Sequence, residues 1–322
     1  MYTNLNSLSP ANNPEEYQLH MAAWEWSIIE PIIIRCEEDI RSKNWKEHGL
    51  KPFKHQVQNL IYFCRKLPCT LIADDVGLGK TVSAALILSE LMYRNRVQRT
   101  LIVAPKILCS QWKGELLNLF GLQSEIAESG KTFRELINKK SIHIIITTYA
   151  ILREHMTYIT HEHFQMGIFD EAHKLRNLYG TPKPPKIATV IQNAFQEQIF
   201  QFILMLTATP VQNRIWDIYS LIDLLKKIEG ESNPFGNKHH FRNNFLEDSK
   251  GITLQENQKE IFRQILQKSI CRTRRKDTNL PFPERQVINE EFSLEKNEKR
   301  LYEILKALVS ECHLSEIGRA HV

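Results

Sequence analysis

Residues 74–81 form the string DDVGLGKT, a glycine-containing loop whose spacing suits phosphate binding. Glycine lets backbone N–H groups curl closely around phosphate oxygens. In loops of this type, a lysine placed as Lys80 contacts the β- and γ-phosphates, and a hydroxyl placed as Thr81 binds Mg²⁺. The strict pattern has glycine six residues before that lysine, where this chain has Asp74, so a turn that only joins a strand to a helix stays open for this string alone. We predict that the nucleotide-binding residues here are Asp75, Gly77, Leu78, Gly79, Lys80 and Thr81.

Two adjacent carboxylates follow an apolar run in the string IFDEAH at 168–173. Carboxylates at the end of a buried strand are costly unless a metal or another cation meets them. We predict that Asp170 holds Mg²⁺, directly or through water, and that Glu171 polarises the attacking water as a general base. A solvated acidic turn is the alternative, and the phosphate-binding string upstream argues against it. The two strings together predict ATP and Mg²⁺ as cofactors, with Lys80, Asp170 and Glu171 as catalytic residues and Thr81 with Asp170 at the metal.

A third string, LTATPVQN at 206–213, also follows an apolar run. Small hydroxyl side chains in this position can hydrogen-bond the acidic string and respond to the state of the γ-phosphate. An ordinary turn at the end of a strand is the alternative, because Thr-Pro favours turns. We predict that coupling between the strings involves His173, Thr207, Thr209, Gln212 and Asn213.

Short apolar runs separated by helical patterns must position these strings. Such alternation predicts a parallel sheet covered by helices on both faces, which is an α/β fold. Ligands bind such sheets outside the carboxyl ends of the strands, where all three strings fall. The expected strands are 70–73, 100–104, 143–148, 166–169 and 202–206, with helices over 81–94 and through Trp112, Leu116 and Leu119.

Composition restricts the class of protein. The 322 residues are 42% hydrophobic and 25% charged, which is typical of a soluble globular protein. The net charge of +5 suits a polyanion partner, although a solvated surface with a slight lysine excess explains it equally. The six cysteines have no paired metal-binding spacing, so we expect reduced thiols, no structural metal and a cytoplasmic location. We see no signal peptide, and the apolar stretches are too short to cross a membrane.

With these strings in order, the chain resembles the first RecA-like lobe of a Snf2-family (Swi2/Snf2) ATPase of helicase superfamily 2, in its bacterial form. The resemblance covers about residues 50–302 and includes the acidic residue at the absent glycine. It implies a RecA-like P-loop NTPase lobe, and it makes Gln56 the residue that reads adenine. The matching strings lie at 52–56, 74–81, 104–115, 147–149, 170–177, 206–213 and 272–281.

The resemblance also implies an activity, in which ATP hydrolysis drives translocation along double-stranded DNA, usually without strand separation. Contacts to the phosphate backbone carry no sequence information and weaken steeply with salt. A solvated loop remains the alternative for two of the basic residues, Lys174 and Arg176. The DNA-binding residues that the resemblance implies are Lys106, Gln111, Thr147, Thr148, Lys174 and Arg176.

The expected organisation follows from composition and periodicity together with the same resemblance. Residues 1–48 are a partly disordered N-terminal extension with helical periodicity, and 49–285 are the ATP-binding lobe. Residues 228–260 form a mobile polar excursion between helices. Residues 286–316, a strand-like segment and then a helix from about 294 to 312, begin the connection to a second RecA-like lobe.

We expect that second lobe to be missing from this chain, which would then hydrolyse ATP very slowly. Residues 317–322 break the helical pattern, and one codon choice for them reads like a common sequencing adapter. We therefore expect a truncated frame with a non-native tail, against a natural frayed terminus as the alternative.

Two other functions stay open on the sequence. The first is the motor lobe of a restriction or defence helicase, which shares the same strings. The second is a non-catalytic, nucleotide-dependent DNA-binding scaffold. Intact Lys80, Asp170 and Glu171 count against the scaffold, because a scaffold has no need of a general base.

Overall fold

The computed structural model describes residues 32–179, 184–212, 214–248, 251–278, 280, 293 and 295–319, with side chains of the last helix described to residue 308. The chain divides into two compact units, Met1–Thr278 and Asn279–Val322. In the second unit the described helix is α12 (Lys296–Arg319), which is longer at its C-terminal end than the helix predicted from the sequence. The strand-like segment predicted at 286–292 lies outside the described residues.

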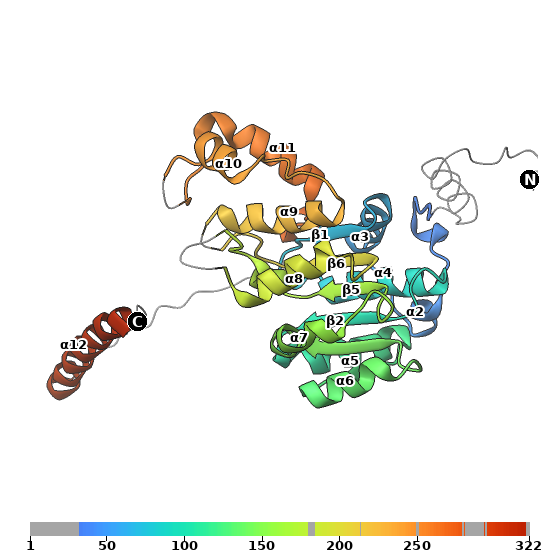
Figure 1. Ribbon diagram of the computed structural model, residues 1–322, viewed down its shortest axis with the longest axis horizontal. Coiled ribbons are helices and arrows are strands. Elements are labelled where there is room, and N and C mark those ends of the chain that lie inside the picture. The colour runs from blue at the N-terminus through green and yellow to red at the C-terminus, as the bar shows by residue number, and fades with distance from the viewer. Residues whose placement is uncertain are drawn as a thin grey trace, which may run out of the picture. The chain divides into compact units, whose positions relative to one another are not determined.

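The described part of the first unit is built on a parallel sheet of six strands in the order β1-β6-β5-β2-β4-β3. Figure 1 labels β1, β6, β5 and β2, which lie side by side in this order. Every neighbouring pair is parallel, which confirms the predicted sheet. All carboxyl ends therefore meet at one edge. The short strand β3 was not predicted. The strands are β1 (Cys69–Ile72), β2 (Thr100–Ala104), β3 (Glu125–Ile126), β4 (Ile144–Thr148), β5 (Met166–Phe169) and β6 (Phe202–Leu206).

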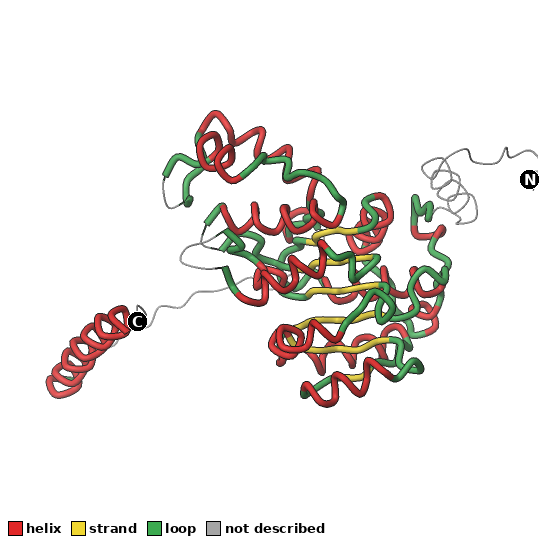
Figure 2. Tube along the Cα trace, viewed as in Figure 1, coloured by secondary structure: helices red, strands yellow, loops and turns green. Residues whose placement is uncertain are grey.

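Helices cover both faces of this sheet (Figure 2). Successive strand residues point to opposite faces, so Leu71 lies in one core and Ile72 in the other. Helices α3, α4 and α5 pack on the face of Ile72, and α6 to α9 pack on the face of Leu71. The α-helices that the structure describes in this unit are α2 (Asn44–Glu47), α3 (Lys54–Arg65), α4 (Lys80–Tyr93), α5 (Lys106–Phe120), α6 (Gly130–Asn138), α7 (Tyr149–His155), α8 (Lys186–Gln196), α9 (Trp216–Ile228), α10 (Lys238–Phe245) and α11 (Lys259–Ser269).

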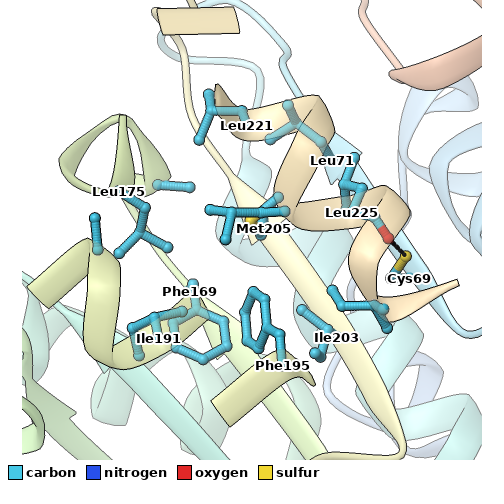
Figure 3. Close-up of a cluster of buried hydrophobic side chains, with 14 of the residues drawn as sticks. Cys69, Leu71, Phe169, Leu175, Ile191, Phe195, Ile203, Met205, Leu221 and Leu225 are labelled. Carbon is cyan, nitrogen blue, oxygen red and sulfur yellow. Dashed lines mark hydrogen bonds between the residues drawn. The ribbon is translucent and has the colours of Figure 1, made fainter. Parts of the chain in front are cut away.

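The core on the Leu71 face holds the acidic string in place (Figure 3). Phe169, the last residue of β5, packs edge-on against Phe195 of α8, with ring centroids 5.3 Å apart. Leu175, just beyond the acidic string, is buried in the same core. Packing fixes the residues on both sides of 170–173. The two carboxylates therefore directly follow a rigid strand end.

The segment 228–260, predicted as a mobile polar excursion between helices, contains a helix and buried side chains in its central part. Helix α10 lies within it, and Phe235, Phe241 and Phe245 are buried there. The Phe235 ring stacks on Phe262 of α11 at a centroid distance of 5.0 Å. The polar composition concealed three phenylalanines that stabilise the segment by packing on one another.

Residues 34–45, assigned from the sequence to the N-terminal extension, pack on the lobe through Ile34, Ile40 and Trp45. Their anchor is Glu90, a fully buried residue of α4. Its Oε2 accepts from the Ser42 N–H at 2.8 Å, and its Oε1 accepts from the Arg41 N–H at 3.0 Å. Arg94 Nε also donates to Glu90 Oε1, at 2.7 Å. The helix that follows the phosphate-binding string is thereby tied to the start of the described chain.

Over the described residues, the structure contains no helix with the length and apolar character that a membrane crossing requires.

We predict that Glu90→Gln lowers the free energy of unfolding at pH 7 by about 1–3 kcal/mol, because it weakens buried charge-assisted hydrogen bonds. Burial alone would raise the pKa of Glu90, but its donors from Ser42, Arg41 and Arg94 lower it below the ordinary value. A lowered pKa contributes stability above the unfolded pKa of about 4.3, and this is lost as the pH falls through the folded pKa. The difference between the two proteins should therefore shrink below about pH 4 in urea melts.

Glu135→Gln is the matched control, because Glu135 is exposed on α6. It should leave the free energy of unfolding close to that of the wild type at both pH values. Equal stability of the Glu90 and Glu135 variants at pH 7 would contradict the anchoring role of Glu90.

Candidate active site

The phosphate loop, residues 74–81, runs from the carboxyl end of β1 into the first turn of α4. Gly77 and Gly79 have φ values of 85° and 70°, a region that favours glycine. A Cβ atom on Gly79 would also lie 2.6 Å from Gln56 Nε2, so a larger residue would clash there. Helix α4 begins at Lys80, which directs its N-terminal N–H groups and its positive dipole end at the loop.

Lys80 bends back over its own loop. Its Nζ donates to the carbonyl oxygens of Asp74 and Asp75, at 3.0 and 3.3 Å. Burial lowers the pKa of Lys80, and the charges of Glu171, Asp74 and Asp170 oppose that shift. The lysine and the acidic string, far apart in sequence, therefore share one electrostatic environment.

Asp170 is a buried carboxylate with a fixed orientation. Its Oδ2 accepts from Trp112 Nε1 and its Oδ1 from the Glu171 N–H, both at 2.8 Å. The Tyr149 hydroxyl donates to the Asp170 carbonyl at 2.6 Å. Burial raises the pKa of Asp170, although the donors from Trp112 and Glu171 oppose the shift. A divalent cation would relieve the desolvation of this carboxylate, so the residue fits a metal ligand.

A cavity of about 280 Å³ joins the phosphate loop to the acidic string. The Thr81 hydroxyl and the Asp170 carboxylate supply oxygen ligands, the type that Mg²⁺ prefers. Gln111, which the family resemblance assigned to DNA, lies in this lining and donates to Glu115 Oε1 at 2.7 Å. The lining residues are Gly77, Gly79, Lys80, Thr81, Val82, Leu108, Gln111, Trp112, Glu115, Asp170 and Glu171.

Glu171 has a left-handed backbone with φ of 51°. For a residue other than glycine this conformation costs about 1–3 kcal/mol, and such strain clusters at functional sites. Its Oε2 lies 2.9 Å from His173 Nδ1, and Thr207 Oγ1 lies 3.5 Å from the same nitrogen. Burial lowers the pKa of His173, although the Glu171 charge opposes the shift, so the neutral imidazole is favoured. His173 thus links Glu171 to Thr207 of the third string.

The third string, residues 206–213, continues this network. The Thr209 N–H donates to Thr207 Oγ1 at 3.2 Å, and Gln212 Nε2 donates to Thr209 Oγ1 at 3.1 Å. Arg176 donates to Gln212 Oε1, and its Nε lies 3.9 Å from Asp217 Oδ1. The structure therefore brings together the described residues predicted to couple the strings. Asn213 lies outside the described residues.

Gln56 touches the phosphate loop. Its Oε1 accepts from the Phe53 N–H at 2.9 Å, and its Nε2 donates to the Leu78 carbonyl at 3.3 Å. His55 Nε2 lies 2.8 Å from the same carbonyl oxygen. Adenine reading by Gln56 stays a prediction, and the structure gives the residue a contact within the loop itself.

The residues assigned to DNA differ in their surroundings. Lys106 and Lys174 are exposed just past the carboxyl ends of β2 and β5. Thr147 is fully buried, and Thr148 Oγ1 accepts from the Ile151 N–H at 3.3 Å to cap α7. The two lysines therefore have the accessibility that a backbone contact needs.

Asn59 is a site residue that the sequence did not reveal. Fully buried on α3, it donates from Nδ2 to Asp74 Oδ2 at 2.7 Å and to Ser83 Oγ at 3.0 Å. An asparagine between the apolar residues Val57 and Leu60 was the available signal. Because a buried amide needs partners, such a residue indicates a polar neighbour across the core.

Comparison with known proteins identifies relatives of this architecture. The family model of the SNF2-related domain matches residues 17–321. The chain is 30% identical over 258 residues to the uncharacterized ATP-dependent helicase YqhH of Bacillus subtilis, covering 80% of this chain but 42% of that protein. It is 29% identical over 168 residues to the RNA polymerase-associated protein RapA of Sodalis glossinidius, covering 50% of this chain and 17% of that protein.

A solved structure, the Sulfolobus solfataricus SWI2/SNF2 ATPase core in complex with dsDNA, matches with a TM-score of 0.56 and 25% identity. The match covers 71% of this chain and 47% of that one. The chain therefore spans less than half the length of YqhH, RapA and this archaeal core.

We predict that Trp112→Phe raises the Mg²⁺ concentration needed for half-maximal ATP binding by about 10- to 100-fold, as expected when a donor that orients a metal ligand is lost. The substitution removes the Nε1–H group that fixes Asp170. Calorimetric titration of ATP at several Mg²⁺ concentrations measures the effect.

Trp45→Phe is the matched control. Trp45 is equally buried, and within the described residues its Nε1 has no hydrogen-bond partner. Both variants should lose packing, but only the Trp112 variant should change the Mg²⁺ dependence. The same Mg²⁺ dependence in both would refute the orienting role of Trp112.

Proposed function

We propose that this chain, which belongs to the SNF2-related family, is the ATP-binding and ATP-hydrolysing lobe of a motor that moves along double-stranded DNA. The convergence of Lys80, Thr81, Asp170 and Glu171 on one cavity carries the proposal. The names of the relatives, ATP-dependent helicase and SWI2/SNF2 ATPase core, support the same reaction.

Each residue of the cavity has a role that its chemistry suits. Lys80 binds the β- and γ-phosphates, and the N–H groups of the phosphate loop surround their oxygens. Thr81 and Asp170 hold Mg²⁺, which neutralises charge on the phosphates when it is bound. Glu171 orients the attacking water and accepts its proton. His173 holds the Glu171 carboxylate and connects it to Thr207.

DNA contact is assigned to the carboxyl edge of the sheet. Lys106 and Lys174 are exposed there, and the archaeal SWI2/SNF2 core was solved with dsDNA. A second RecA-like lobe completes the motor and supplies an arginine finger, a group worth about 10³–10⁵ in rate. The five cysteines whose side chains the structure describes are free thiols, which suits the cytoplasmic location that we propose.

The alternatives are less well supported. A nucleotide-dependent scaffold does not require a strained glutamate beside a buried aspartate, and this chain has both in Glu171 and Asp170. The comparisons favour neither the scaffold nor a restriction or defence helicase.

We expect Lys80→Ala to weaken Mg²⁺–ATP binding by roughly 10- to 100-fold, because it removes a charge-assisted contact to the phosphates. Glu171→Gln should bind Mg²⁺–ATP normally but release phosphate about 10²–10⁴ times more slowly, as expected for loss of a general base. Calorimetry measures binding, and single-turnover release of labelled phosphate measures the chemical step.

Glu154→Gln serves as the control for both measurements, because Glu154 is exposed on α7 and pairs with Arg153. It should match the wild type. Undiminished nucleotide binding by the Lys80 variant would refute the assignment of the phosphate loop.

A separate measurement tests the DNA surface. Lys106→Ala and Lys174→Ala should each weaken binding to duplex DNA regardless of its sequence, and each should reduce the slope of log affinity against log salt by about 1. Lys140→Ala is the control, because Lys140 is exposed before β4, at the opposite edge of the sheet. If the salt slope changes for Lys140→Ala but for neither of the other two variants, the DNA does not bind at the carboxyl edge of the sheet.

A further inference from the structure

Residues 271–275, which we call the edge segment, run beside the phosphate loop. Strand β1 is at one end of the sheet order, and Ile72 forms a parallel bridge with Cys271 at its open side. The Cys271 N–H donates to the Leu71 carbonyl at 2.9 Å, and the Ala73 N–H donates to the Cys271 carbonyl at 2.7 Å. The Asp75 N–H donates to the Thr273 carbonyl at 3.0 Å. The edge segment therefore continues the parallel ladder past the end of β1.

In two hydrogen bonds of this ladder, the acceptor is a side-chain carboxylate. In a regular parallel register, the Thr273 and Arg275 N–H groups would donate to the carbonyls of Ala73 and Asp75. Instead the Thr273 N–H donates to Asp74 Oδ1 at 2.6 Å, and the Arg275 N–H donates to Asp75 Oδ2 at 3.0 Å. The carboxylates of Asp74 and Asp75 thus take the place of main-chain carbonyls.

This substitution leaves the main-chain carbonyl of Asp75 for the lysine, whereas the Asp74 carbonyl has no place in the regular ladder to the edge segment. The carbonyl oxygens of Asp74 and Asp75 are the two that accept from Lys80 Nζ. Asp74 and Asp75 therefore contact the edge segment through their side chains. They contact Lys80 through their main-chain carbonyls. Arg275 Nε adds a contact to the Val76 carbonyl, at 2.8 Å.

Asp74 is held from a second side by α3. Its Oδ2 accepts from Asn59 Nδ2 at 2.7 Å, and Asn59 Oδ1 accepts from Cys271 Sγ at 3.0 Å. Asp74 is fully buried, so both of its oxygens require donors. A glycine at this position could supply neither acceptor.

We propose that the edge segment, acting through Asp74 and Asp75, positions the phosphate loop, and that Asp74 is a positioning residue for Lys80. The proposal rests on the function proposed above, because it concerns the same nucleotide site. Linkage makes the effect reciprocal, so nucleotide bound to the loop stabilises the ladder to the edge segment.

Asp74→Asn is the decisive variant. Asparagine has one carbonyl oxygen in place of two carboxylate oxygens, so it cannot accept from both Thr273 and Asn59. Mg²⁺–ATP affinity, measured by calorimetry, should fall about tenfold, as expected for loss of a hydrogen bond to a charged group. Hydrogen exchange gives the second readout. Mg²⁺–ATP should slow exchange in the peptide 271–278 of the wild type and leave it unchanged in the variant.

Asp277→Asn is the matched control. Asp277 lies in the same part of the chain, is exposed, and accepts from the N–H and Nε groups of Arg274. Its affinity and its exchange response should match the wild type. Should Asp74→Asn fail to fold, Asp75→Ala decides the question, because Asp75 is partly exposed and its loss removes the acceptor for Arg275.

The outcomes separate this proposal from the proposed function. If the wild type binds Mg²⁺–ATP while the Asp74 and Asp75 variants equal the Asp277 variant in affinity and exchange, the positioning role is wrong. If the wild type itself fails to bind Mg²⁺–ATP, the proposed function is wrong and the positioning role is overturned with it.

Discussion

Burial of a carboxylate costs several kcal/mol unless donors or a cation replace the lost water. Asp74, Glu90 and Asp170 are all buried in this lobe. Their donors come from different elements: Asp74 is met by α3 and the edge segment, Glu90 by residues 41–42 and its own helix, and Asp170 by α5. Each acid therefore joins segments that are distant in the sequence. The three acids lie on α4 or directly after β1 and β5, the elements around the candidate nucleotide site.

The two carboxylates of the acidic string have different surroundings, although they are adjacent in the sequence. Asp170 is fixed by hydrogen bonds from α5, from α7 and from the N–H of the next residue, and is suited to hold an ion in one position. Glu171 is partly exposed, has a strained backbone and contacts His173, whose other neighbour is Thr207. A group that must respond to nucleotide needs such freedom, whereas a metal ligand needs rigidity.

The sequence predicted the elements whose signals are local. The apolar runs of β1, β2, β4, β5 and β6 and the spacing in 74–81 each lie within a few residues, and parallel pairing follows from their alternation with helices. Contacts between distant residues outside the three strings, or between one of them and the rest of the chain, could not be predicted in this way. The bond from Thr273 to Asp74 spans 199 residues, and the one from Trp112 to Asp170 spans 58. The helix α10 was missed because its phenylalanines are stabilised by one another across a polar sequence.

The order of synthesis determines when the edge segment can bond to the phosphate loop. The phosphate loop is synthesised before the edge segment. The N–H groups that donate to the carboxylates of Asp74 and Asp75 are made 199 and 200 residues later. At about 5–20 residues per second, that interval is roughly 10–40 s. Until residue 271 has been made, the edge of β1 that faces the edge segment stays unpaired, and until residue 273 has been made Asp74 lacks one of its donors. A finished phosphate loop therefore marks a nascent chain whose synthesis has passed residue 275.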